Sequence, residues 1–201
     1  MSQTKIRDVA LSHFASYGYE GASLSKIAEE VGIKKPTIYS HYKGKNDLFL
    51  TAVRYVFQLE RRKVLSYFKM AQVKPLKEKL EGFFTMIEEG FNNSYTTKFL
   101  LRVSFFPPAA LMDEVMTLAN SFIDGLHRQL IKLMKYHQKQ GEFAGIEIEE
   151  AALAYVTMVD GVLVELLFAG NHRFRKRVEA AFPIYWSGIH CMADKIKENR
   201  P

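Results

Sequence analysis

The chain has 201 residues, and 48% of them are hydrophobic, which is enough to bury a substantial core and excludes an intrinsically disordered chain. Its formal net charge of +6 permits a polyanionic partner without requiring one. The single cysteine excludes an internal disulfide, and charges interrupt every long apolar stretch, so we expect a cytoplasmic protein with no membrane partner.

Apolar residues recur every three or four positions along nearly the whole chain, which predicts an all-α fold. The first three predicted helices cover residues 3–17, 24–31 and 35–42. Gly18 and Gly32 are expected to end the first two, because glycine readily adopts the left-handed conformation found after a helix. Ser23 is a good N-cap for the second helix, and Pro36 suits the first turn of the third.

The same spacing predicts six further helices. A long fourth helix should run from about Gly44 to Met70, followed by helices over residues 76–93, 96–104, 109–140, 147–168 and 173–198. Pro183 lies inside the last of these patterns, so that helix should be kinked there or begin there. We therefore predict an N-terminal three-helix domain over residues 1–47 and a larger helical domain over residues 48–201.

The second and third predicted helices, joined by a short turn at Gly32, match a helix-turn-helix unit. In that unit the second helix enters the DNA major groove with its N-terminal residues near base edges. The candidate DNA-binding residues are Ser23, Ser25, Lys34, Lys35, Pro36, Thr37, Tyr39, Ser40, His41 and Lys45. Ile38 and Tyr42, four positions apart, are expected to face the core.

The candidate residues divide into two expected roles. Pro36, Thr37 and Ser40 should lie near base edges and influence which sequence is bound, whereas Tyr39 and Lys45 should bind phosphate oxygens. From the residues alone another interpretation stays open, in which the tyrosines are core aromatics and the lysines are only solvated surface.

The stretch from Gly21 to Phe49 reads GxSLxxIAxxVGIxKPTIYxHYKxKxxLF, and with Phe14 and Gly18 it resembles the N-terminal domain of the TetR family of transcriptional regulators. The resemblance covers roughly residues 1–50. It implies an all-helical homodimer in which a long fourth helix joins the DNA-binding domain to a regulatory domain. It further implies that a small molecule bound to the regulatory domain releases the protein from its operator.

The predicted helix over residues 147–168 is apolar on nearly all sides, so it must be covered on all sides. The resemblance implies that the last two helices pack with those of a second copy into a four-helix bundle. The candidate interface residues are Tyr155, Val162, Leu163, Leu166, Phe182, Tyr185, Trp186 and Ile189. A fully internal core within a monomer is the alternative.

Aromatic residues are abundant in the middle of the chain and could line an apolar ligand pocket. The candidates are Phe83, Phe84, Met86, Ile87, Phe91, Phe105, Phe106, Tyr155, Met158 and Asp160. Each of the apolar residues could equally be plain core. Asp160 could anchor a ligand, pair with a buried partner or face a dimer axis.

The sequence shows no spacing typical of a metal site and no catalytic motif, so we expect neither a metal, nor a cofactor, nor enzyme activity. The favoured interpretation is a homodimeric repressor that binds operator DNA and responds to a small-molecule effector. The first alternative is a constitutive DNA-binding dimer without ligand control. The second is a helical enzyme or lipid carrier with an incidentally basic end.

Overall fold

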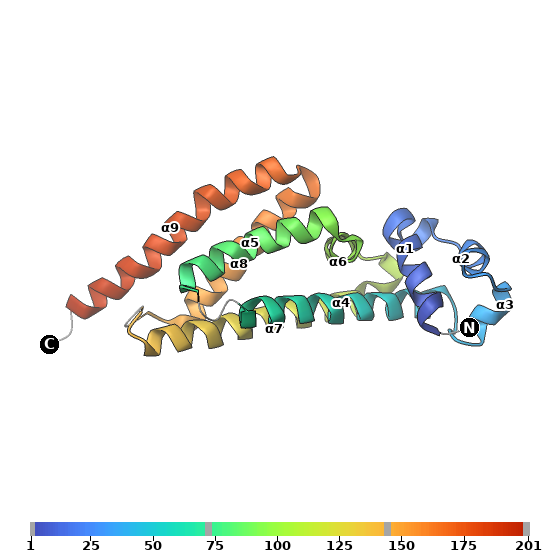
Figure 1. Cartoon of the computed structure of the whole chain (residues 1–201), viewed down its shortest axis with the longest axis horizontal. Helices are drawn as coiled ribbons and strands as arrows, with labels where there is room; N and C mark the ends of the chain where they lie inside the picture. The colour runs from blue at the N-terminus through green and yellow to red at the C-terminus, as the bar shows by residue number, and fades with distance from the viewer. Residues whose placement is uncertain (1–2, 71–73, 143–145, 199–201) are drawn as a thin grey trace. The chain divides into compact units, whose positions relative to one another are not determined.

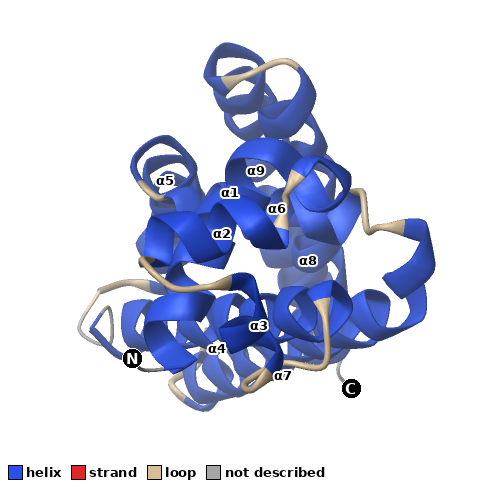
Figure 2. Ribbon diagram, turned by 90° about the vertical axis from the view of Figure 1, so that its right-hand side faces the viewer, coloured by secondary structure: helices blue, strands red, loops and turns tan. Residues whose placement is uncertain are grey.

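The computed structural model describes residues 3–70, 74–142 and 146–198, with side chains described as far as residue 190. Within these ranges the chain forms helices and no strands, which confirms the all-α prediction (Figure 2). The helices in Figure 1 are α1 (Gln3–Gly21), α2 (Leu24–Val31), α3 (Lys35–Tyr39), α4 (Lys45–Met70), α5 (Leu76–Asn93), α6 (Tyr95–Phe105), the short 3₁₀ turn η2 (Ala109–Leu111), α7 (Met112–Lys139), α8 (Ile148–Phe168) and α9 (Asn171–Glu198).

Several helix boundaries differ from the predicted ones, and the predicted helix over residues 109–140 is the turn η2 followed by α7. The predicted break at Gly18 is present as a non-helical residue with φ 70°, but helical structure resumes and α1 extends to Gly21. The third helix was predicted to reach Tyr42 and ends instead at Tyr39. Pro183 lies within α9, which begins well before it, at Asn171.

The described chain divides into two compact units. The first comprises Met1–Lys63 with Gly90–Ser121, and the second comprises Val64–Glu89 with Phe122–Pro201. Helices α4, α5 and α7 each contribute residues to both units, so the compact units do not follow the boundary predicted after residue 47. The division into a DNA-binding domain and a regulatory domain at that boundary stays a prediction.

The core of the first unit is a cluster of aromatic rings around Phe49, which is 2% exposed. The ring of Phe49 lies 4.9 Å from that of Phe14, 5.0 Å from that of Tyr19 and 6.0 Å from that of Phe99. Edge-to-face pairs of this kind add about 0.5–1.5 kcal/mol beyond their buried area. Through Phe99, α6 therefore forms part of the core that supports α1 and α4.

A buried carboxylate joins α4 to the start of α6 in the same unit. Glu60 is 7% exposed, and its carboxylate accepts hydrogen bonds from the hydroxyls of Thr96 (2.8 Å) and Thr97 (3.1 Å). The ammonium of Lys63 donates to the same carboxylate at 2.7 Å. Three donors satisfy the group, which is the condition under which a buried charge is tolerated.

The core of the second unit lies where α5, α8 and α9 meet. The ring of Tyr155 is fully buried, 5.4 Å from that of Phe84, and its hydroxyl donates to the carbonyl oxygen of Leu80 at 2.6 Å. Phe182 of α9 lies 6.1 Å from Phe84, between ring centroids. By length and composition alone α8 could cross a membrane, with a mean hydropathy of 1.8. Its packing against α9 is equally typical of a core helix.

Candidate nucleic-acid interface

A short turn between α2 and α3 sets the direction of the third helix. Ser23 caps α2 by accepting a hydrogen bond from the backbone N–H of Ser25 at 3.3 Å. Gly32 ends the helix with φ 82°, a left-handed backbone conformation that residues other than glycine rarely adopt. The N–H of Ile33 then donates back to the carbonyl of Ala28 at 2.9 Å, so the chain reverses within a few residues.

Side chains of α1 hold the C-terminal half of α2 in place. The ammonium of Lys5 donates to the carbonyl oxygen of Val31 at 3.1 Å. Nε2 of the buried His13 lies 2.7 Å from the carboxylate of Glu30. Because these contacts fix α2, they also fix the turn that leads into α3.

Helix α3 is anchored by one side chain and exposes most of the others. Ile38 is fully buried, and Tyr39 is 52% exposed. Of the remaining predicted DNA-binding residues on and around α3, Thr37 is half-buried and the others, Lys34, Lys35, Pro36, Ser40 and His41, are exposed. Figure 1 shows α3 next to α2 and α1, at the N-terminal end of the chain. The structure thus brings the predicted residues of this stretch onto one short surface segment.

A tertiary contact holds the chain just beyond the end of α3. Tyr42, predicted to be helical and to face the core, is 3% exposed, and its hydroxyl donates to the carbonyl oxygen of Gln3 at 2.9 Å. Burial raises the pKa of this phenol. Ser40 closes the helix and donates its hydroxyl proton to the carbonyl of Thr37 at 2.7 Å. His41 consequently lies beyond the helix, although it remains exposed.

Two predicted DNA-binding residues already have partners in the protein. The ammonium of Lys45 donates to the carbonyl oxygen of Glu20 at 3.2 Å and lies 4.5 Å from the ring centroid of Tyr19. Ser23 uses its oxygen as the α2 cap. An ammonium has three donors and a hydroxyl can donate while it accepts, so both retain donors for a phosphate. Neither contact with DNA is tested by the structure, and both stay predictions.

Lys43 was not among the candidates although it lies in the same segment. It is exposed, and its backbone N–H donates to the carboxylate of Asp47 at 2.9 Å, which caps the start of α4. The clustering of lysines in the sequence was the signal that could have identified it. With Lys34 and Lys35 it gives this surface three exposed cations.

The predicted pocket residues do not lie in one compact unit. Phe91, Phe105 and Phe106 belong to the first unit, and the last two of these are exposed. The others belong to the second unit: Phe83, Phe84 and Tyr155 are buried in its core, and Met86, Ile87, Met158 and Asp160 are half-buried. A shared cavity of these residues stays a prediction.

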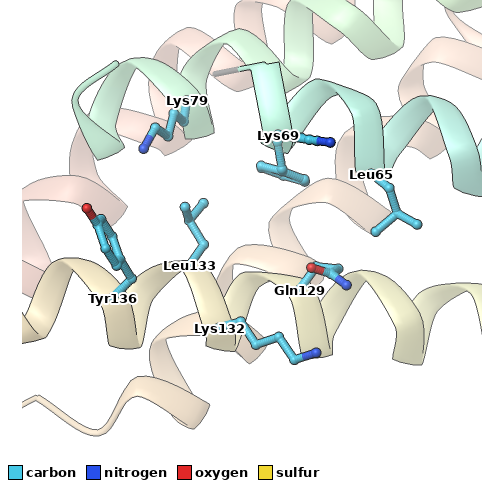
Figure 3. Close-up of a pocket in the computed structure, with 8 residues that line it drawn as sticks. Leu65, Lys69, Lys79, Gln129, Lys132, Leu133 and Tyr136 are labelled. Atoms are coloured by element: carbon cyan, nitrogen blue, oxygen red, sulfur yellow. The ribbon is translucent and has the colours of Figure 1, made fainter. Parts of the chain in front are cut away.

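The described part of the second unit contains a different cleft, with a volume of about 580 Å³. Its lining residues are Leu65, Phe68 and Lys69 of α4, Lys79 of α5, and Gln129, Lys132, Leu133 and Tyr136 of α7 (Figure 3). None of them was among the predicted pocket residues. These three segments are far apart along the chain. The spacing of apolar residues within one helix could therefore not reveal the cleft.

The predicted interface residues mostly face the interior of their own chain. Tyr155, Val162, Leu163, Leu166, Phe182 and Ile189 are buried, and Tyr185 and Trp186 are half-buried. An interface on α8 and α9 stays a prediction, and so do the residues named for it, most of which are buried within their own chain.

Asp160 lies half-buried in α8, and burial raises the pKa of its carboxyl above the ordinary value of 3.8. Folding thus favours the protonated form, and this stabilisation is lost as the pH rises through the raised pKa. We expect Asp160→Asn to raise the free energy of unfolding at about pH 7 but not at about pH 3, because the amide is never ionised and so avoids the cost of burying a charged carboxylate. Urea unfolding at about pH 3 and about pH 7 measures this. An equal difference at both pH values would contradict the assignment.

Among the described residues no group of three or more histidine, cysteine, aspartate or glutamate side chains could hold a metal ion. The chemistry that the first unit does offer is an exposed, cationic helix with hydroxyl and imidazole groups. These groups are suited to a polyanion, as phosphate oxygens are bound by lysine, hydroxyl and backbone donors.

Comparison with known proteins agrees with this geometry. The family described as "Bacterial regulatory proteins, tetR family" matches residues 6–52. YezE, an uncharacterised HTH-type transcriptional regulator of Bacillus subtilis, is 32% identical over 83 residues, which are 41% of this chain and 40% of that protein. IcaR of Staphylococcus epidermidis, a negative transcriptional regulator of the biofilm operon icaADBC, is 38% identical over 53 residues, covering 26% of this chain and 29% of IcaR. This chain therefore spans less than half the length of either relative.

A longer match links the chain to a fatty acid metabolism regulator protein of Bacillus subtilis, with 24% identity over 83% of this chain and 69% of that protein. Among solved structures, the transcriptional regulator FadR from Bacillus subtilis in complex with stearoyl-CoA has a TM-score of 0.69 and 20% identity, covering 94% of this chain and 100% of that one. A TetR-family transcriptional regulator from Agrobacterium tumefaciens has a TM-score of 0.68 and 17% identity, covering 92% and 95%. At these identities the solved structures show that the fold is shared.

Proposed function

We propose that this chain, which belongs to the TetR family of regulatory proteins, is a sequence-specific DNA-binding repressor. We further propose that it acts as a homodimer in the cytoplasm. A small molecule that binds outside the DNA-binding helices releases it from its operator. The main support for the proposal is the exposure of Lys35, Pro36, Tyr39 and Ser40 on and directly after a helix that the buried Ile38 anchors.

The homodimer is supported by an exposed apolar stripe on the last two helices. On α8 the exposed positions recur every three or four residues: Leu153, Thr157, Gly161, Val164 and Phe168. On α9 Ile184 is 75% exposed, and Gly188 follows one turn later. Large exposed side chains lie here beside small residues that allow close approach, which is typical of a helix-helix interface. We call this surface the α8–α9 stripe.

Ligand control is supported by what solved relatives bind. FadR of Bacillus subtilis, which shares the fold, was crystallised with stearoyl-CoA. A ligand can release the operator only if it binds the released state better than the DNA-bound state. We propose that it shifts the spacing of the two α3 helices away from the roughly 34–36 Å that matches one DNA turn.

The experiment that tests the proposal is selection of bound duplexes from a random DNA pool. We expect enrichment of an inverted repeat whose half-sites are about one helical turn apart, because a two-fold dimer presents two copies of α3. Failure to enrich any sequence would rule out the proposal that the protein binds DNA sequence-specifically. If a repeat is enriched but no small molecule alters its affinity, the constitutive DNA-binding dimer is the correct alternative.

Lys45→Ala separates a phosphate contact from a structural one. If Lys45 binds a phosphate, operator affinity should fall for every sequence, and the slope of log K against log salt should become shallower by about 0.9. If it only holds the Glu20 carbonyl, the slope should stay unchanged. Fluorescence anisotropy over a salt series measures both values. Lys98→Ala is the matched control, since Lys98 is exposed on α6 and is not among the predicted DNA-binding residues.

A further inference from the structure

The cleft in the second unit contains a buried lysine. Lys79 is 1% exposed, whereas Lys69 and Lys132 on the same cleft are exposed. Taking an ammonium out of water is costly unless polar groups compensate it. Burial lowers the pKa of Lys79, and the carboxylate of Glu142 opposes this effect. A lysine placed here at such a cost needs a physical explanation.

A histidine and a glutamate compensate the charge of Lys79. Its ammonium donates to Nε2 of His137 at 3.0 Å, and Nδ1 of the same ring lies 2.7 Å from the carboxylate of Glu142. Because an ammonium cannot accept, His137 must offer the lone pair of Nε2 to Lys79, and its Nδ1–H then donates to Glu142. These two linked hydrogen bonds hold the ammonium in one position and use one of its three N–H groups.

The walls of the cleft combine positive charge with apolar surface. Its described lining contains three lysines and no acidic residue. Leu65, Phe68 and Leu133 supply the apolar part, and Leu65 is 37% exposed, so hydrocarbon is available to a ligand. Figure 3 shows Lys79 on α5 across from Leu133 and Tyr136 on α7. The volume of about 580 Å³ lies within the range of about 300–1,000 Å³ that small-molecule sites occupy.

We propose that this cleft binds an anionic amphiphile, meaning an apolar chain with a carboxylate or phosphate head, and that this molecule is the effector of the repressor. Lys79 binds the head, Lys69 and Lys132 attract it to the mouth of the cleft, and the chain covers Leu65, Phe68 and Leu133. The effector role, though not the binding site, rests on the proposed function.

Calorimetry on the full chain tests the ligand class. The probes are octanoate, decanoate, dodecanoate and dodecyl phosphate, each below its micelle concentration, with dodecyltrimethylammonium as the cationic control. We expect the anions to bind, with affinity rising about two- to fourfold for each added methylene. The tighter of dodecanoate and dodecyl phosphate identifies the head group. Equal binding of the cation, or no dependence on chain length, would overturn the proposal.

Lys79→Met tests the anchor, because methionine keeps an unbranched side chain of nearly the same length and removes the charge. Dodecanoate should bind at least about tenfold more weakly, as expected for a lost hydrogen bond to a charged group. Lys77→Met is the matched control, since Lys77 is exposed on the same helix. The affinity of this variant for dodecanoate should equal that of the unchanged protein. If Lys79→Met does not fold, the exposed pair Lys69→Gln and Lys132→Gln should weaken binding roughly threefold or more. Unchanged affinity in the variants that fold would overturn the site.

Operator affinity with and without dodecanoate distinguishes this inference from the proposed function. Release of the native protein, but not of Lys79→Met, supports both. Release that persists in Lys79→Met overturns the cleft as effector site and leaves ligand-controlled repression standing. Calorimetric binding without any change in operator affinity overturns the effector role and leaves DNA binding untouched.

Discussion

Replacing Glu60 by Ala is expected to lower the free energy of unfolding by about 3 kcal/mol, because it disrupts a buried charged hydrogen-bond network. The carboxylate is the shared acceptor for Thr96 and Thr97, at 2.8 and 3.1 Å, and the ion-pair partner of Lys63. Without it, two buried hydroxyls lose their acceptor at the junction of α4 and α6. Guanidinium unfolding followed by circular dichroism measures the loss.

Two further variants identify the cause of that loss. Glu60→Gln keeps a side-chain oxygen that can accept from one threonine, so it should cost roughly half as much. Gln58→Ala, on an exposed position of the same helix, should change stability by no more than about 0.5 kcal/mol. If Glu60→Ala were as mild as Gln58→Ala, the network would not stabilise the α4–α6 junction.

Replacing Ile184 by Arg is expected to dissociate the proposed dimer. A two-fold interface buries the substituted residue twice, so two unpaired charges would have to leave water at the α8–α9 stripe. We expect the dimer dissociation constant to rise by more than about 100-fold. Sedimentation should then give a mass near the 23.1 kDa of one chain instead of twice that value.

Loss of the dimer should also weaken operator binding by roughly 100-fold or more. In the dimer, binding of one α3 helix places the second α3 helix at high local concentration beside its own half-site, and a monomer lacks this effect. Met70→Arg is the matched control: Met70 is 83% exposed and apolar, but lies on α4 rather than on the stripe. If Ile184→Arg remained a dimer, the interface would lie elsewhere. If both variants dissociated, the effect would reflect net charge rather than the stripe.

The helix-turn-helix could be predicted closely because its signals are local. Ser23, Gly32 and Pro36 act within one turn of their own positions, and the spacing of Ile27, Ala28 and Val31 orients the helix. The end of α3 could not be predicted in this way. Beyond that end, Tyr42 is buried and donates a hydrogen bond to Gln3, 39 positions away.

The interface residues show where periodicity stops being informative. Because α8 is apolar on nearly all sides, the sequence offered no reason to prefer Leu153 over Tyr155 as the exposed residue. The packing of α5 and α9 decides it: Tyr155 is buried against Phe84 and hydrogen-bonded to Leu80, while Leu153 stays 55% exposed. Pattern alone therefore identified α8 as apolar on nearly all sides, but not which of its apolar residues are exposed.

The sequence by itself determined the helical class, the approximate positions of the helices and the segment that faces DNA in the proposed function, since these depend on capping, turn chemistry and periodicity over a few residues. Only the tertiary structure decided which apolar side chains form the core and where Lys79 meets His137, 58 positions further along the chain. Such contacts form when distant helices pack together, and their geometry depends on the whole fold rather than on any local pattern.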